Sequence, residues 1–153
     1  MMKITRILVP YDWSELSKRA FEFAASMARD LDAEMIVLYA VPVAVEAYGP
    51  PSENYLNRLR GELCSVKPRD LQIRIQYRVM EGDPIAAIVN VANELKCELI
   101  VMGTHGRGGL RRFLMGSVAE KVIRKAPCLV MTLRGDSTLP CSESQLCSVN
   151  KGS

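Results

Sequence analysis

The chain has 153 residues, of which 48% are hydrophobic and 24% charged, and these proportions are ordinary for a soluble globular protein. This length corresponds to one domain that buries roughly two-thirds of its unfolded surface without disulfide bonds or metal ions. The 20 basic and 17 acidic side chains leave a net charge of +3. So mild a charge gives no support to nucleic-acid binding, and we expect no nucleic-acid partner.

The chain shows no sign of membrane attachment or secretion. No apolar run approaches the roughly 20 residues that a membrane-spanning helix needs, and residues 1–6 lack the layout of a signal peptide. The five cysteines form an odd set without the spacing of a metal site. We therefore expect a cytoplasmic protein with reduced thiols. Cys141 and Cys147 could pair with each other, although nothing in the sequence requires it.

Apolar runs and helical patterns alternate between residues 4 and 133. In chain order we expect a strand at 4–10, a helix from Ser14 to Leu31, a strand at 35–40, a helix at 56–66, a strand at 73–79, a helix from Asp83 to Leu95, a strand at 99–102, a helix at 118–126 and a strand at 128–133. Ser14 and Asp83 are the expected N-caps, because their side chains can accept hydrogen bonds from the first helical turn. Pro84 suits the first position of its helix.

Strands that alternate with helices predict βαβ units and a mostly parallel sheet. The expected third strand alternates apolar and polar residues, which is typical of an edge strand with one face in solvent. With right-handed crossovers, this predicts an α/β fold with a doubly wound, five-stranded parallel sheet in the order 3-2-1-4-5 and helices on both faces. Residues 134–153 show no periodicity, so we expect a domain at 1–133 and a disordered tail.

The segment from Gly103 to Ser117 is the most informative about function. It follows an apolar strand pattern, precedes a helical one, and contains four glycines in seven positions, at 103, 106, 108 and 109. Glycines let main-chain amides approach a ligand closely, while arginines at 107, 111 and 112 add positive charge. A helix start contributes unpaired N–H groups. Together these features predict a phosphate site.

The predicted topology gives this segment a partner. In such sheets, ligands bind beyond the carboxyl ends of the strands, where the strand order reverses. Here the reversal falls between the first and fourth strands, so the turns after Pro10 and Met102 should face one another. Asp12, in the first turn, could accept from ribose hydroxyls or position a metal ion, and the second strand near Ala40 could form an apolar slot for a base. These parts describe a nucleotide site.

At this point the motifs resemble a known family. The nucleotide-binding signature of universal stress proteins is similar to Gly103-x2-Gly106-x9-Gly116-Ser117, and also to residues 9–14 at the end of the first strand. The likeness covers about residues 4–133. It implies a Rossmann-like α/β domain, ATP binding and homodimerisation, often through the fifth strand.

The resemblance also implies roles for single residues. Asp12 would meet the ribose or adenine side, next to Pro10 and to Tyr11, which replaces a more common Thr or Val. Ala40 would line the base pocket, where many relatives have a valine. Below the sugar would lie Met102 and Gly103, and the phosphates would be held by Gly106, Arg107, Gly116, Ser117 and Val118.

Three functions fit these residues. The chain could be a regulatory module that binds ATP, with Mg²⁺ carried by the phosphates; an ATPase or nucleotide-transfer enzyme; or a dimeric interaction protein with a vestigial pocket. No Gly-x4-Gly-Lys-Ser/Thr loop is present, and only Asp12 and the single histidine, His105, could act as a general base. We therefore predict adenine-nucleotide binding with little turnover. We also expect dimerisation through the apolar edge at 128–131, since exposed strand edges are usually covered.

Overall fold

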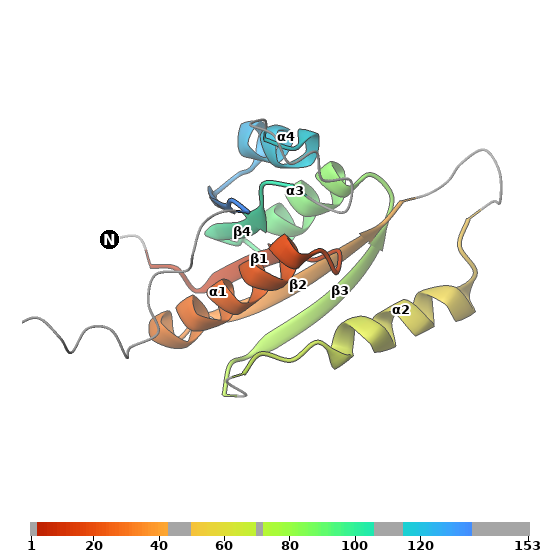
Figure 1. The fold of residues 1–153 in the computed structure, drawn as a ribbon, viewed down its shortest axis with the longest axis horizontal. Helices are drawn as coiled ribbons and strands as arrows, with labels where there is room; N and C mark the ends of the chain where they lie inside the picture. The colour runs from red at the N-terminus through yellow and green to blue at the C-terminus, as the bar shows by residue number, and fades with distance from the viewer. Residues whose placement is uncertain (1–2, 43–49, 70–71, 106–114, 136–153) are drawn as a thin grey trace, which may run out of the picture.

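The computed structural model describes residues 3–42, 50–69, 72–105 and 115–135. Within these residues, strands and helices alternate along the chain as predicted (Figure 1): β1 (Arg6–Pro10), α1 (Glu15–Leu31), β2 (Glu34–Val41), α2 (Glu53–Ser65), β3 (Ile75–Glu81), α3 (Pro84–Glu94), β4 (Leu99–Gly103), α4 (Ser117–Lys125) and β5 (Leu129–Leu133). No described helix combines the length and the apolar character that crossing a bilayer requires. The tail predicted to be disordered, with Cys141 and Cys147, lies outside the described residues from position 136 onward.

The five strands form one parallel sheet in the order β3-β2-β1-β4-β5, which confirms the predicted fold class. At its centre, Leu8 of β1 pairs with Ile36 of β2 on one side and with Ile100 of β4 on the other. The chain therefore builds outward from β1 to β3 and then returns to the middle of the sheet to add β4 and β5. As a result, the carboxyl ends of β1 and β4 are neighbours.

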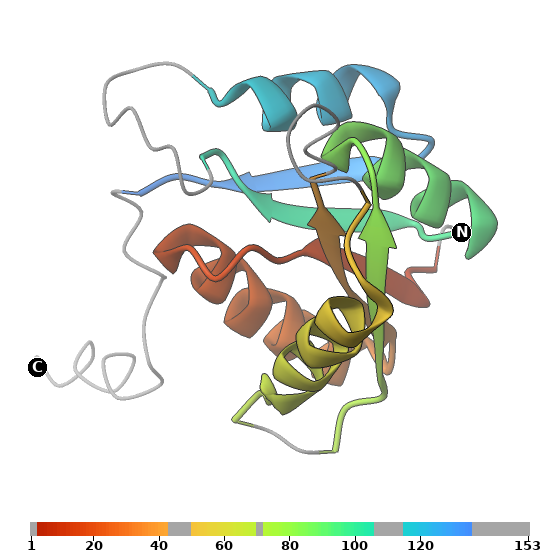
Figure 2. The same cartoon turned by 90° about the vertical axis from the view of Figure 1, so that its right-hand side faces the viewer.

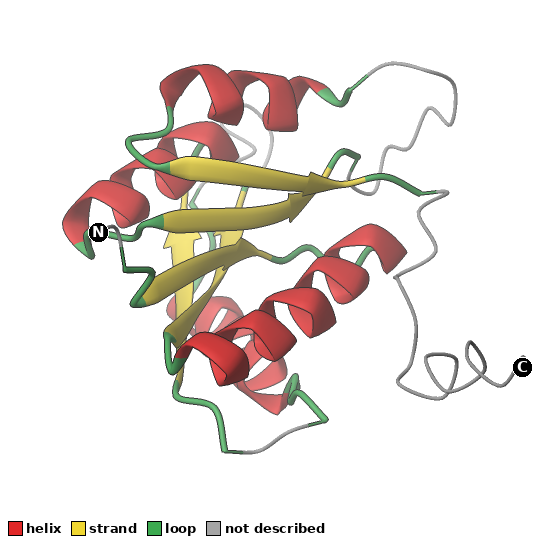
Figure 3. Ribbon diagram, turned by 90° about the vertical axis from the view of Figure 1, so that its left-hand side faces the viewer, coloured by secondary structure: helices red, strands yellow, loops and turns green. Residues whose placement is uncertain are grey.

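Helices cover both faces of the sheet, α1 and α2 on one and α3 and α4 on the other (Figures 2 and 3). Successive side chains of a strand point to opposite faces, so each strand contributes to two cores. On β1, Ile7 and Val9 join the core under α1, whereas Leu8 joins the core under α3 and α4. Each strand end can therefore present one side chain to each face.

The predicted helix caps are confirmed. The Ser17 main-chain N–H donates to Ser14 Oγ at 3.2 Å, and the Ala86 N–H donates to Asp83 Oδ2 at 2.9 Å. Pro84 occupies the first turn of α3, where its missing N–H costs no hydrogen bond. These caps fix where α1 and α3 leave the carboxyl edge of the sheet.

The edge strand β3 differs from its prediction in its bounds, which are Ile75–Glu81 rather than 73–79, and in its burial. Its place at the edge is confirmed, but the side chains from Ile75 to Met80 are all half-buried rather than alternately buried and exposed. Tyr77 and Val79 pack in the core on the α1 face. On the opposite face, Arg78 pairs with Glu94 of α3 at 3.0 Å, so the expected solvent-facing side is partly covered.

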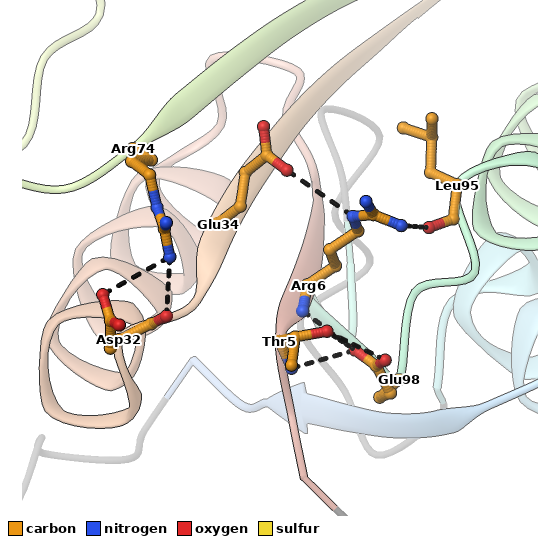
Figure 4. Close-up of polar contacts among 7 residues, drawn as sticks. All are labelled: Thr5, Arg6, Asp32, Glu34, Arg74, Leu95 and Glu98. Atoms are coloured by element: carbon orange, nitrogen blue, oxygen red, sulfur yellow. Dashed lines mark hydrogen bonds and ion pairs between the residues drawn. The ribbon is translucent and has the colours of Figure 1, made fainter.

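A carboxylate joins the central strands at their amino ends (Figure 4). Glu98, just before β4, accepts hydrogen bonds from the Thr5 N–H at 3.0 Å, the Arg6 N–H at 2.8 Å and the Thr5 hydroxyl at 3.0 Å. Partial burial alone would raise the pKa of the Glu98 carboxyl group, but these hydrogen bonds outweigh it and hold the pKa below its ordinary value. The contact therefore favours the ionised, folded state.

We expect Glu98→Gln to lower the free energy of unfolding by about 1–2 kcal/mol at neutral pH, because hydrogen bonds to an ionised group are lost. Because the pKa of Glu98 is lower in the folded state, its ionised carboxylate stabilises the fold at pH values above the ordinary carboxyl pKa of about 4.3. This stabilisation is lost as the pH falls through the pKa of the folded state. The free energies of unfolding of wild type and variant should therefore become equal in acid, which urea unfolding from about pH 7 to about pH 3 measures. Glu34→Gln, which removes only a 3.5 Å ion pair with Arg6, is the control. A Glu98→Gln difference that does not shrink in acid would contradict the assignment.

Candidate functional site

The end of β4 lies against the start of α1, the helix that follows β1. A Cβ atom added to Gly103 at the end of β4 would lie only 2.8 Å from Cβ of Leu16 in the first turn of α1. The glycine is therefore needed for this close approach. It brings the end of β4 against α1, just after the turn that contains Asp12.

The Asp12 turn is fixed by hydrogen bonds that use its own polar groups. The Ser14 N–H donates to Asp12 Oδ1 at 3.0 Å, and the Asp12 N–H donates to Ser17 Oγ at 3.3 Å. The buried Ser17 hydroxyl in turn donates to the Ser14 carbonyl at 2.9 Å. Asp12 itself is half-buried, so its carboxylate is held at the carboxyl edge of the sheet in a defined orientation.

Trp13, between Asp12 and Ser14, has a φ of 61°. This left-handed conformation costs a residue with a Cβ atom roughly 1–2 kcal/mol, and surrounding contacts must compensate. The indole meets the Tyr39 ring at a centroid distance of 4.6 Å and the Tyr11 ring at 5.6 Å, both edge to face. Such aromatic contacts are favourable beyond the area that they bury.

The Tyr11 side chain does not lie with the other predicted site residues. It is 5% exposed and packs in the core on the α1 face, with its ring 5.8 Å from that of Phe21. Burial raises the pKa of its phenol. Its main-chain N–H donates to the Leu38 carbonyl at 2.8 Å. Only main-chain atoms of Tyr11 are therefore placed to contact a ligand at this edge.

Thr104 organises the second turn. The Gly116 N–H donates to the Thr104 carbonyl at 2.7 Å, and the Thr104 N–H donates to the Leu133 carbonyl at 2.9 Å. The buried Thr104 hydroxyl is hydrogen-bonded to Nδ1 of His105 at 3.0 Å. The main-chain bonds hold the start of α4 and the end of β5 next to the residue that follows β4. Sequence reasoning missed Thr104, and the only signal was its place between Gly103 and the glycines that follow.

The start of α4 has the features of an anion site. Its N-cap is Gly116, which has no side chain to accept from the first helical turn. The N–H groups of Ser117 and Val118 lack acceptors within the helix, as at every helix start, and the helix dipole adds partial positive charge. Ser117 is exposed and Val118 half-buried. A phosphate group could accept hydrogen bonds from these donors.

Apolar site residues gather on the same face as α4. Ala40 and Met102 belong to the core under α3 and α4, and Pro10 points to this face because it lies two positions after Leu8. Ala40 is half-buried and pairs in register with Met80 of β3. The small Ala40 side chain therefore lies near the carboxyl end of β2, on the sheet face that α3 and α4 cover.

The described part of the chain thus brings most predicted site residues to one edge of the sheet. Gly106 and Arg107 lie outside the described residues. Among those described, no three His, Cys, Asp or Glu side chains gather in a way that could hold a metal ion. At the start of α4, the groups that could meet an anion are main-chain N–H groups and the Ser117 hydroxyl.

The fold and the position of the two turns define a doubly wound α/β domain with its candidate site at the switch point. Residues 3–134 match the model of the universal stress protein family. A universal stress protein of Methanocaldococcus jannaschii is 35% identical over 139 residues, which cover 84% of this chain and 81% of that protein. One of Thermus aquaticus is 32% identical over 133 residues, with coverage of 84% and 97%. The chain belongs to the universal stress protein family.

Solved structures share the fold. The universal stress protein UspA of Lactobacillus plantarum superposes with a TM-score of 0.67 at 24% identity, over 88% of this chain and 100% of that one. A universal stress protein of Archaeoglobus fulgidus in complex with dAMP has a TM-score of 0.64 at 23% identity, covering 86% and 98%. A structure of a universal stress protein in complex with cAMP has a TM-score of 0.64 at 22% identity and also covers 86% of this chain and 98% of that one. At these identities the likeness establishes the fold alone.

Gly116→Ala should destabilise the protein. The new Cβ atom would lie 2.6 Å from the Thr104 carbonyl oxygen, so α4 must shift away from β4, at a cost of about 1–3 kcal/mol. The matched control is Gly61→Ala in α2, where nothing lies within 4 Å of the added atom. That change should stabilise by about 0.5–1 kcal/mol through helix propensity. Equal unfolding midpoints for Gly116→Ala and wild type in urea would contradict this account of the α4 start.

Proposed function

We propose that this protein binds an adenine nucleotide, with ATP as its ligand, at the carboxyl edge between β1 and β4. It acts as a nucleotide-dependent regulatory protein in the stress response. The observation that carries this proposal is the hydrogen bond from the Gly116 N–H to the Thr104 carbonyl at 2.7 Å. Because of this bond, the donors at the start of α4 stand beside the end of β4.

Each part of a nucleotide has matching groups along this edge. In the proposal, the base lies in the apolar slot beside Ala40 and Met102, and the sugar hydroxyls face Asp12. The phosphates accept from the N–H groups and the hydroxyl at Ser117 and Val118, with Gly106 and Arg107 completing the loop. Two structures of the same fold hold cAMP and dAMP, and adenine is common to both ligands. This supports adenine as the base.

Low turnover is part of the proposal, because both general-base candidates already have structural hydrogen bonds. Oδ1 of Asp12 accepts from the Ser14 N–H, and Nδ1 of His105 is bonded to the Thr104 hydroxyl. Mg²⁺, where it takes part, is carried in by the phosphates of the nucleotide. The three described cysteines are free thiols, the usual state in a reducing cytoplasm, which is the compartment that we propose.

Calorimetry with ATP, ADP, AMP and cAMP, followed by single-turnover hydrolysis of ATP, tests the function. We expect ATP to bind and hydrolysis to stay below about one per second, under the usual enzyme range. Ser117→Ala should weaken ATP binding by about 2- to 10-fold, the value of one hydrogen bond. The control Ser26→Ala, on the exposed surface of α1, should leave it unchanged. No binding at millimolar ATP would favour an interaction scaffold, and faster hydrolysis would favour an enzyme.

We also propose that two copies of the chain associate through β5. This strand is the outermost of the sheet on its side, and it exposes large apolar side chains, with Leu129 51% and Met131 36% exposed. On the neighbouring helix α4, Ile123 is 42% exposed. Proteins usually cover such an edge, and a second β5 offers both main-chain partners and apolar contact.

Met131→Lys should therefore shift the protein from dimer to monomer, because a charge would be buried between the two copies without a partner. Sedimentation velocity at micromolar concentration measures the change in mass. Tyr55→Lys is the matched control, since Tyr55 is a similarly exposed apolar side chain, 43% exposed, on α2. A monomeric wild type, or equal dissociation of both variants, would remove β5 as the interface.

A further inference from the structure

The turn after β1 is built on a residue that does not favour its conformation. Trp13 is left-handed, with a φ of 61°. Glycine, asparagine and aspartate are the residues that usually adopt this conformation, and a bulky side chain there is an outlier. Outliers of this kind persist only where surrounding contacts determine the backbone, and they concentrate at functional sites.

Contacts of the indole ring hold this turn. The ring is half-buried and packs against the apolar cluster of Val41, Leu56 and Leu59, which joins the end of β2 to α2. It also lies edge to face against Tyr39 at 4.6 Å and Tyr11 at 5.6 Å. Since Tyr11 is 5% exposed, the indole is anchored on a buried part of the core.

The anchored backbone in turn orients Asp12. The hydrogen bond from the Ser14 N–H to Asp12 Oδ1, 3.0 Å long, spans Trp13. If Trp13 rotated to an extended or right-handed conformation, the Ser14 N–H would turn away from the carboxylate. The position of the indole and the direction of the Asp12 carboxylate are therefore coupled.

We propose that Trp13 is a positioning residue for recognition of the nucleotide sugar. Its indole, anchored on Tyr39 and Tyr11, fixes the turn that directs the Asp12 carboxylate toward the ribose hydroxyls. This inference rests on the proposed function, which supplies the nucleotide. The inference adds that the preference for nucleotides with sugar hydroxyls depends on the Trp13 indole. This ring lies on the α1 face of the sheet, opposite the face proposed for the base.

Affinities for ATP and for 2′,3′-dideoxy-ATP test the proposal in wild type, Trp13→Gly and Trp13→Phe. Wild type should prefer ATP by about 10-fold or more, since a hydrogen bond to a carboxylate is lost with the dideoxy ligand. Trp13→Gly, which suits the left-handed turn but lacks the anchor, should reduce this preference to less than about 2-fold. Trp13→Phe keeps an edge-to-face ring and should retain the preference.

A purely structural role of Trp13 would weaken both ligands equally in Trp13→Gly, and an unchanged preference would overturn the proposal. Tyr77→Leu is the control, because Tyr77 belongs to the same core but donates to the Val66 carbonyl beyond the carboxyl end of α2. It should lower stability and leave the preference unchanged. Loss of preference in this variant as well would also count against a specific role of Trp13.

A second measurement needs no nucleotide. Amide hydrogen exchange of Ser14 should be at least about 10-fold faster in Trp13→Gly than in wild type, because its acceptor on Asp12 is no longer held in place. Trp13→Phe should exchange at nearly the wild-type rate. Equal exchange in wild type and Trp13→Gly would overturn the inference even if ATP binds. Absence of ATP binding by wild type would instead overturn the proposed function, so the two failures are distinguishable.

Discussion

The pairing of β1 with β4 is the interaction on which the other features depend. Leu8 pairs with Ile100 in the middle of the sheet, and Glu98 reaches Thr5, 93 residues away in the sequence. Because β4 adds to β1 and not to β3, the carboxyl ends of these two strands are adjacent. All carboxyl ends of a parallel sheet lie on one side, and this strand order makes the turn after β1 and the end of β4 neighbours there.

Different groups satisfy the main chain at the amino ends of the strands (the amino edge) and at their carboxyl ends (the carboxyl edge). At the amino edge, Glu98 and Arg6 satisfy main-chain groups with charged side chains. At the carboxyl edge, main-chain bonds among Thr104, Gly116 and Leu133 do the same. A glycine cap leaves the N–H groups of the first turn of α4 without a competing side chain. The amino edge therefore serves stability, while the carboxyl edge keeps donors available for a ligand.

The order of elements, the strand order and the N-caps could be predicted from the sequence. The elements and caps follow from local signals, namely residue periodicity and the cap residues Ser14 and Asp83. The strand order follows from a general rule, the right-handedness of crossovers. The face of Tyr11 could have been predicted too, since it lies two positions after the buried Val9. We assigned it instead by resemblance, and the structure packs its side chain into the opposite core.

Other features could not be predicted, because they depend on partners distant in sequence. The role of Thr104 rests on main-chain bonds to Gly116 and Leu133, which no residue pattern encodes. The left-handed Trp13 contradicts its own conformational preference, and its contacts with aromatic and apolar side chains from distant parts of the chain compensate for this. The half-buried face of β3 depends on the pairing of Arg78 with Glu94. In each case tertiary contact overrides the local signal.

The low turnover that we propose rests on the two turns rather than on the anion site. Oδ1 of Asp12 and Nδ1 of His105, the general-base candidates, are already engaged in structural hydrogen bonds. A nucleotide bound here would persist, and its effect would have to pass through the groups that it contacts. The Asp12 turn is bonded to Ser17 of α1 and, through Trp13, packs against α2. Coupling between binding sites is reciprocal. A partner protein that binds more strongly when the nucleotide is present would therefore raise the affinity for the nucleotide by the same factor.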